Sequence, residues 1–242
     1  MICKACGQNK KLIDAHIIPK SFYMNLRSDS NHLDLLSSSS PKKTGRSFKG
    51  EYDKNILCKD CDSKFEIYDD YAKKLLIDCF AKFKEIKIDG RVQAWRMDDF
   101  DFNKIKMFFL SVLWRASISK RPFFRRVKLG PHENTIKQIL LNGNKDSNNI
   151  YTIALSKFIP NHDSTIEKTI IDPDLFKMNG INYYRIYLAG YTAWVKIDKR
   201  KSCSTMNKIE LNHNHGFIIS RDFFESKEFG ILKKIFIAKR QQ

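Results

Sequence analysis

The sequence predicts an α+β protein built of two parts. Two C-x2-C pairs bracket the first part, residues 1–75. In the second part, residues 76–242, some segments repeat apolar residues at the three-to-four spacing of helices, while others alternate apolar and polar residues as strands do. We therefore expect a small cysteine-bracketed module followed by a larger, basic region of helices and an antiparallel sheet.

The composition favours a soluble globular chain with a polyanionic partner. Of the 242 residues, 42% are hydrophobic and 29% are charged, which is ordinary for a globular protein. Apolar runs are far shorter than the roughly 20 residues needed to cross a bilayer, so we expect no membrane partner. The excess of 44 Lys and Arg over 27 Asp and Glu gives a formal charge of +17. This charge favours nucleic acid, DNA more than RNA, and the N-terminus without a secretory signal predicts a cytoplasmic protein.

Four of the six cysteines have the spacing of metal ligands. Cys3 and Cys6 form one C-x2-C pair, and Cys58 and Cys61 form another. The cytoplasm keeps thiols reduced, so such pairs indicate metal binding rather than disulfides. Four thiolates from two knuckles would complete a closed tetrahedral site for a structural Zn2+. The alternative is two unrelated redox or chance pairs.

The segment between the two pairs has the pattern of a small folded unit. Residues 11–18 predict a strand and residues 21–30 a short helix, whereas residues 37–50 have the composition of a loop. Residues 52–58 return as an extended segment into the second pair. Apolar residues at helical spacing then predict a long helix over residues 61–83.

These motifs carry a resemblance to a known family. The order C-x2-C, A-H-I-I-P, N-I-L-C-x2-C and helix resembles the HNH endonucleases that bear zinc knuckles, over about residues 1–75. The resemblance implies a ββα-metal fold with a histidine as general base, an asparagine that orients it, and a helix residue that holds a catalytic Mg2+ or Mn2+. By position these roles fall to His16, Asn55 and Asp62. The chain is also similar to a bacterial HNH-like group with H-I-I-P-K and a W-R-A-S helix, which adds the acid Asp69.

The sequence departs from the family pattern beside the histidine. Ala15 stands where many HNH enzymes have a second metal ligand, and Asp14 would point to the opposite face of a regular strand. Asp62, Glu66 and Asp69 share one helical face, so carboxylates could replace the missing ligand for Mg2+ or Mn2+. The same spacing also fits a solvated helix face near the positive helix N-terminus.

The chemistry explains why these residue types matter. Phosphodiester hydrolysis needs a deprotonated water and a cation on the phosphate oxygens. A neutral imidazole serves as the base at cellular pH. The alternative for His16 is a supporting histidine that packs beneath the knuckle.

Two stretches in the second part concentrate positive charge. They are residues 120–128, K-R-P-F-F-R-R-V-K, and residues 196–202, K-I-D-K-R-K-S. Phe123 and Phe124 suit either stacking on bases or burial in the core, and a solvated surface is the alternative for each stretch. The predicted contacts to nucleic acid are Lys120, Arg121, Arg125, Arg126, Lys199, Arg200 and Lys201.

The remaining patterns concern architecture. Residues 102–119 predict an apolar helix, in which we expect Arg115 to pair with an acid, and residues 129–143 predict a second helix between Pro131 and Gly143. Period-two alternation predicts a hairpin about Ala189 and Gly190 in residues 182–198. Further strands are expected at residues 149–159 and 215–220, and a terminal helix at residues 221–240. His213 and His215 fit a surface turn better than a ligand pair.

Taken together, the residues and the resemblance predict a metal-dependent endonuclease that hydrolyses nucleic-acid phosphodiester bonds. A defence role against phage rests on family analogy alone. One alternative is a catalytically weak or inactive zinc-containing DNA- or RNA-binding protein, which Ala15 favours. Another is a toxin-like ribonuclease with the same site. An activating partner protein or a homo-oligomer stays open.

Overall fold

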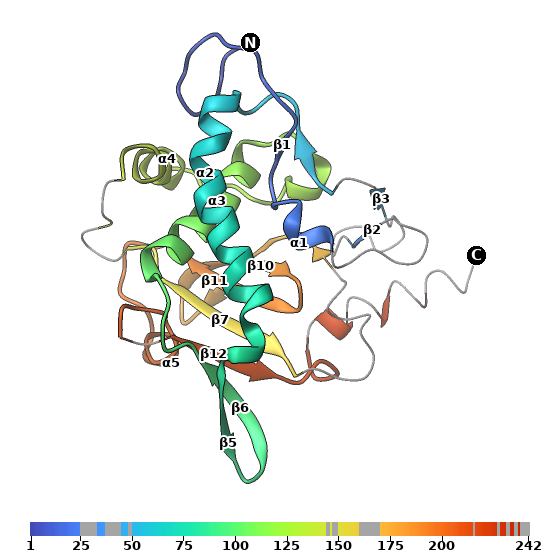
Figure 1. The fold of residues 1–242 in the computed structure, drawn as a ribbon, viewed down its shortest axis with the longest axis vertical. Helices are drawn as coiled ribbons and strands as arrows, with labels where there is room; N and C mark the ends of the chain where they lie inside the picture. Colours follow the sequence, from blue (N-terminus) through green and yellow to red (C-terminus); the bar gives the residue numbers. More distant parts are fainter. Residues whose placement is uncertain are drawn as a thin grey trace.

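Helices pack on a mostly antiparallel sheet, so the mixed α+β architecture is confirmed (Figure 1). None of the helices in the described part of the chain has the length and apolar character needed to cross a membrane. The structure is a computed structural model that describes residues 1–24, 33–36, 45–47, 50–143, 146, 150–159, 170–214, 216–226, 228–230, 233–234 and 237.

A short two-stranded ladder opens the fold. Strand β1 (Ala15–His16) pairs antiparallel with β4 (Tyr52–Asp53), so that Ala15 lies opposite Asp53. The predicted strand over residues 11–18 is thus mostly irregular, because the amide of Ala15 turns back to donate to Ile13 O at 2.9 Å. Helix α1 (Ser21–Met24) follows β1, and the rest of the predicted helix, residues 25–30, lies outside the described residues.

The second cysteine pair leads directly into a long helical segment. Helix α2 (Lys59–Lys73) continues as a π-helix (Lys74–Asp78) and a short 3-10 helix (Phe80–Lys82). Phe65, Leu75 and Leu76 are among the buried residues on its apolar face, as the helical spacing predicted. The segment begins two residues before the predicted start.

A small three-stranded sheet was not predicted. Strand β2 (Leu33–Leu36) pairs with β3 (Gly45–Ser47) and with β8 (Ile170–Ile171). The segment over residues 37–50 therefore contains a strand where loop composition predicted none. Its residues 37–44, 48 and 49 lie outside the described part of the chain.

Helix α3 (Phe102–Ile118) is apolar on nearly all sides because it packs against α2, α4 and the sheet. The Asp101 side chain caps its start by accepting from the Lys104 amide at 3.0 Å. A 3-10 turn (Pro122–Phe124) and α4 (His132–Asn142) follow, and α4 ends at Gly143, whose φ of 63° is the left-handed conformation glycine adopts readily. Both helices confirm the predicted spans closely.

The main sheet has seven strands in the order β5-β6-β12-β7-β11-β10-β9. Neighbouring strands are antiparallel except β12 and β7, which are parallel. The predicted strands and the hairpin at Ala189 and Gly190 are confirmed. The β5–β6 hairpin, which projects from the body in Figure 1, was not predicted. Helix α5 (Ser204–Asn207) precedes β12. The strand bounds are β5 (Lys84–Ile88), β6 (Arg91–Arg96), β7 (Ile153–Phe158), β9 (Asp174–Met178), β10 (Ile181–Leu188), β11 (Tyr191–Lys196) and β12 (Phe217–Arg221).

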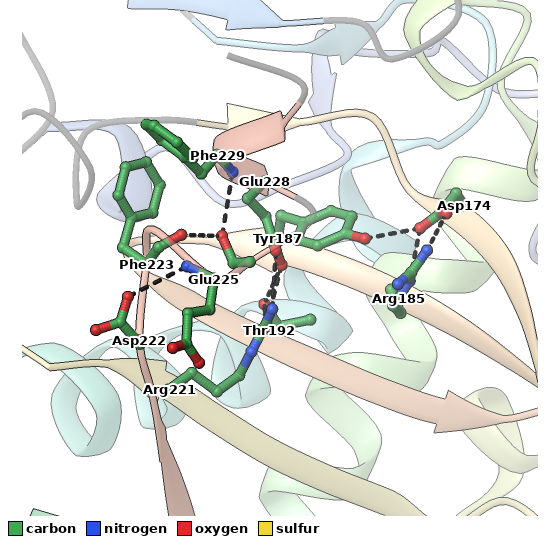
Figure 2. Close-up of polar contacts among 11 residues, drawn as sticks. Asp174, Arg185, Tyr187, Thr192, Arg221, Asp222, Phe223, Glu225, Glu228 and Phe229 are labelled. Atoms are coloured by element: carbon green, nitrogen blue, oxygen red, sulfur yellow. Dashed lines mark hydrogen bonds and ion pairs between the residues drawn. The ribbon is translucent and has the colours of Figure 1, made fainter. Parts of the chain in front are cut away.

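One face of this sheet packs on the core and the other carries buried ion pairs (Figure 2). Arg185 binds Asp174, and Tyr187 donates to the same carboxylate at 2.8 Å. Arg221 binds Glu228 at 2.8 Å. Since Arg185 alternates with core residues along β10, these pairs occupy the second face. The terminal helix predicted over residues 221–240 starts later than expected, because Arg221 ends β12 and residues 222–226 are not helical, whereas residues 228–230, 233–234 and 237 are helical. Residues 227, 231–232, 235–236 and 238–240 lie outside the described residues.

A single cluster of buried side chains extends from Cys3 to Ile218. It includes residues on both sides of the predicted boundary at residue 75, and Phe65 of α2 meets Trp114 of α3 edge-on with ring centroids 6.0 Å apart. The division into residues 1–75 and 76–242 stays a prediction. The core nevertheless shows that α3 supports the N-terminal part directly.

Candidate metal centre and catalytic site

The two cysteine pairs come together at the start of α2. The sulfur atoms of Cys3, Cys6, Cys58 and Cys61 all lie within 4.8 Å of one another. Three of these cysteines are buried, and Cys6 is exposed. Zn–S bonds of about 2.3 Å in a tetrahedron place the sulfurs roughly 3.8 Å apart. The four thiols therefore fit a metal ion such as Zn2+ with little rearrangement.

Local backbone geometry builds each half of this centre. The first pair sits in a tight turn in which Gly7, at a φ of 74°, donates its amide to Cys3 O at 2.9 Å. The second pair spans the first turn of α2, where the Cys61 amide donates to Cys58 O at 3.2 Å. The Cys58 amide donates to the Cys3 sulfur at 3.4 Å and joins the halves.

The thiols of this cluster are electrostatically different. Burial opposes ionisation of Cys3, but hydrogen bonds from the backbone amides of Cys58, Cys6 and Ala5 lower the pKa of Cys3 to about 7. Burial and the neighbouring sulfurs raise the pKa of Cys61. Cys3 is thus the thiol that ionises most readily in this cluster, and a bound cation would favour ionisation of the others.

His16 lies on β1, between the two cysteine pairs in the sequence. Its side chain is half-buried, and its ring centroid lies 6.0 Å from that of Tyr52 on β4. Ala15 is fully buried and Asp14 is exposed. The position that holds a second ligand in many HNH enzymes is therefore an apolar core position here.

Asp62 lies in the first turn of α2 and is half-buried. Burial raises its pKa, the charges of Asp69 and Glu66 raise it further, and Arg115 opposes the change. Asp62 is thus within electrostatic reach of these three groups. A bound cation would relieve the cost of keeping this carboxylate ionised.

Asp69 has a protein partner on α3. Its two oxygens accept from Arg115 at 2.7 and 2.9 Å, and the guanidinium is almost completely buried. The expected pairing of Arg115 with an acid is confirmed. With both oxygens of Asp69 engaged, the geometry gives no support to the prediction that Asp69 holds a divalent ion.

Asn55 sits in the turn after β4 and is exposed. The backbone amide of Asn55 donates to Asp53 Oδ1 at 2.9 Å. The other Asp53 oxygen accepts from Ser119 Oγ at 2.8 Å and from the Lys120 amide at 3.1 Å. Sequence reasoning missed Asp53 and Glu51 as buried acids, although they stand two residues apart on either side of Tyr52, a spacing that in extended backbone indicates one shared side.

The predicted catalytic residues do not form a second metal cluster. A metal site formed mainly by side chains needs at least three Cys, His, Asp or Glu residues close enough to share one ion. Among the described residues, only the four cysteines meet this condition. A divalent ion at Asp62 would consequently need water molecules as most of its ligands, which is the usual state of protein-bound Mg2+.

The predicted nucleic-acid contacts are at the surface, but two of them have acidic partners. Arg121 binds the buried Glu51 at 3.2 Å, and Arg200 binds the buried Asp198 at 2.7 Å. The structure places the other five, Lys120, Arg125, Arg126, Lys199 and Lys201, in exposed positions.

The remaining aromatic and histidine candidates have structural positions. Phe124 is buried and Phe123 packs against the core, so the core interpretation holds for this pair. His213 is exposed in a turn with its ring 5.0 Å from Phe102, as expected of a surface residue. His215 lies outside the described residues.

Comparison with protein-family models, with curated proteins and with solved structures finds no match to this chain. The resemblance to HNH enzymes thus rests on the motifs alone.

Proposed function

We propose that the chain is a metal-dependent endonuclease of the HNH type that hydrolyses phosphodiester bonds in nucleic acid. The observation that carries the proposal is the arrangement at the cysteine cluster. Four close sulfurs join the segment before β1 to the start of α2, and β1 pairs with β4. The paired strands β1 and β4 followed by α2 support the proposal of a ββα-metal site, with His16 on the first strand, Asp62 on the helix, and α1, β2 and β3 inserted between the two strands.

His16 acts as the general base that removes a proton from the attacking water. Asp62 would hold a Mg2+ or Mn2+, and that ion would supply the positive charge that phosphodiester hydrolysis needs at the phosphate. Because Asp69 is held by Arg115 and Ala15 is buried, the exposed Glu66, one turn after Asp62, is the further carboxylate that could help to hold the ion. Asn55 lies in the turn between β4 and α2 and serves to orient the base or the substrate.

The four cysteines hold a structural Zn2+ in this proposal. A closed set of four thiolates leaves no open position for substrate, so zinc stabilises the unit and takes no part in the hydrolysis. DNA is the preferred substrate class, and a role in defence against phage stays a family analogy.

One rival function has specific support. The buried Ala15 and the engaged Asp69 remove two candidate ligands, which favours a zinc-containing nucleic-acid-binding protein without strong catalysis. A toxin-like ribonuclease would share the proposed site and differ in substrate.

The test is incubation of the full chain with plasmid DNA and with total RNA, in Mg2+, in Mn2+ and without added divalent ion. We expect His16→Ala to lose at least about 100-fold in cleavage rate, since general bases contribute this much. His213→Ala, which removes an exposed histidine elsewhere, is the matched control.

Equal cleavage by wild type and His16→Ala would remove His16 as the base. Absence of cleavage under every condition, with zinc retained by metal analysis, would favour the binding protein. Cleavage of RNA alone would favour the ribonuclease.

A further inference from the structure

The first basic stretch begins at the strands that carry the candidate site. Asp53 on β4 accepts from Ser119 Oγ and from the Lys120 amide. Arg121 Nε donates to Glu51, whose backbone oxygen accepts from the Ile17 amide at 3.0 Å. Residues 120 and 121 are therefore held beside β1 and β4, next to His16.

The same stretch ends on the main sheet. The Lys128 amide donates to the Tyr184 hydroxyl at 2.8 Å, and that hydroxyl donates to Lys128 O at 2.9 Å. Tyr184 belongs to β10. The first basic stretch thus runs from the small ladder to the middle of this strand.

The second basic stretch lies at the beginning of β10. Arg200 donates to Gly180 O at 2.7 Å, and the Asn182 amide donates to Asp198 at 3.2 Å. Residues 180, 182 and 184 are alternate positions of one segment, and a strand rises about 3.3 Å per residue, so neighbours in this series are about 6.6 Å apart. Both stretches therefore contact the same short segment of β10.

A second set of contacts joins the two stretches through Tyr151 and Thr152. His132, four residues after Lys128, bonds the Tyr151 hydroxyl at 3.0 Å, and Thr152 O accepts from the Lys196 amide at 2.9 Å. Burial lowers the pKa of His132, and the nearby positive charge of Lys199 lowers it further. The two stretches, far apart in sequence, are thus neighbours in space.

The charges are arranged with the acids inside and the bases outside. Glu51 and Asp198 are buried, while their partners Arg121 and Arg200 have side chains 49% and 62% exposed. Six further basic residues of the two stretches are exposed: Lys120, Arg125, Arg126, Lys128, Lys199 and Lys201. The two neighbouring stretches therefore present exposed cations, and the first of these, Lys120, adjoins the strands β1 and β4.

We propose that the two stretches form one continuous track for the phosphate backbone of a nucleic-acid duplex. Binding along the track does not depend on the proposed function; only cleavage of the bound duplex near His16 rests on it. A duplex is favoured over a single strand because single-strand sites use aromatic stacking, whereas Phe124 is buried and Phe123 packs on the core. Contacts to phosphates alone make the binding independent of sequence.

The experiment measures the salt dependence of binding by the zinc-loaded full chain carrying His16→Ala, without Mg2+ or Mn2+. The probes are a labelled duplex of about 20 base pairs and one strand of the same length. Arg125→Ser with Arg126→Ser tests the first stretch, and Lys199→Ser with Lys201→Ser tests the second. Lys84→Ser with Arg91→Ser, on the projecting β5–β6 hairpin, removes the same charge elsewhere.

The slope of log K against log salt is negative. Each track variant should make it shallower by about 1 to 2, since each phosphate contact contributes about −0.9 to the slope. The variant that combines all four changes should make the slope shallower by the sum of the two effects, and the hairpin control should keep the original slope. All variants should keep the melting temperature of the parent chain.

An equal decrease in the hairpin control would overturn the track, because the binding would then follow net charge alone. A decrease from one stretch only would also overturn it, as would tighter binding to the single strand than to the duplex. If the track variants behave as expected and wild type cleaves nothing, the track stands and the nuclease falls. If wild type cleaves nucleic acid but the track variants keep the slope of the parent chain, the nuclease stands and the track falls.

Discussion

The guanidinium of Arg115 binds both carboxylate oxygens of Asp69, at 2.7 and 2.9 Å, in a nearly dry setting. The same group donates to the backbone oxygen of His16 at 2.9 Å. One side chain on α3 thus connects α2 with β1. Through it, the larger part of the chain sets the position of the strand that carries the candidate base.

Arg115→Met should destabilise the chain by about 3–5 kcal/mol, because it leaves the carboxylate of Asp69 buried without its partner. The free energy of unfolding in urea measures the effect. Arg91→Met, which removes an exposed arginine of the β5–β6 hairpin, should change this energy by no more than about 0.5 kcal/mol.

The double variant Arg115→Met with Asp69→Asn tests whether the pair itself is responsible. Its loss should be smaller than the sum of the two single losses, since the second change removes the charge stranded by the first. Strict additivity would mean that the two residues act independently.

Purified chain should contain about one zinc, and Cys58→Ser should lose the metal and unfold the segment around β1. Cys203→Ser is the matched control, since Cys203 lies outside the cluster and precedes α5, where serine is a favourable cap. Metal analysis and proteolysis measure the two effects. Full zinc content in Cys58→Ser would argue against the tetrahedral centre.

Asp62→Ala should remove the dependence of cleavage on Mn2+ and lower kcat/KM by at least about 100-fold, as expected when a charge-stabilising group is lost. Asp70→Ala, an exposed acid on the same helix, should retain both properties. Titration of activity with Mn2+ distinguishes them. If the Asp62→Ala variant still needs Mn2+ for cleavage, then another residue holds the ion.

The chain should lose stability as the pH falls below about 4.3, the ordinary pKa of a glutamate, partly because of Glu228. Burial alone would raise the pKa of Glu228, but hydrogen bonds and the charge of Arg221 hold it below the usual value. A depressed folded-state pKa stabilises the fold above the unfolded pKa, and this stability disappears as the carboxylate protonates.

Glu228→Gln should therefore cost about 1.5–3 kcal/mol at pH 7, the value of hydrogen bonds to charged groups. It should also flatten the acid side of a plot of unfolding free energy against pH. Glu225→Gln, an exposed neighbour shown in Figure 2, should leave that plot unchanged. A parallel downward shift in both variants would contradict the assignment to Glu228.

Local patterns were sufficient for the longest elements. Helix α3 and the hairpin of β10 and β11 follow from apolar periodicity and a turn at Ala189 and Gly190, because these signals depend on residues a few positions apart. The β5–β6 hairpin was missed although Asp89 and Gly90 form a typical hairpin turn. Strands β2 and β8 were missed because they pair across more than a hundred residues.

The sequence by itself determined each half of the cysteine cluster, since a C-x2-C spacing brings two thiols together through local backbone geometry, whereas the contact between Cys58 and Cys3 that joins the halves is tertiary. Tertiary structure alone decided the role of Asp69. Helical spacing placed it on one face with Asp62 and Glu66, where a metal ligand and a solvated acid look alike. The choice depended on Arg115, 46 residues away, because a carboxylate taken out of water binds whichever cation the fold brings to it.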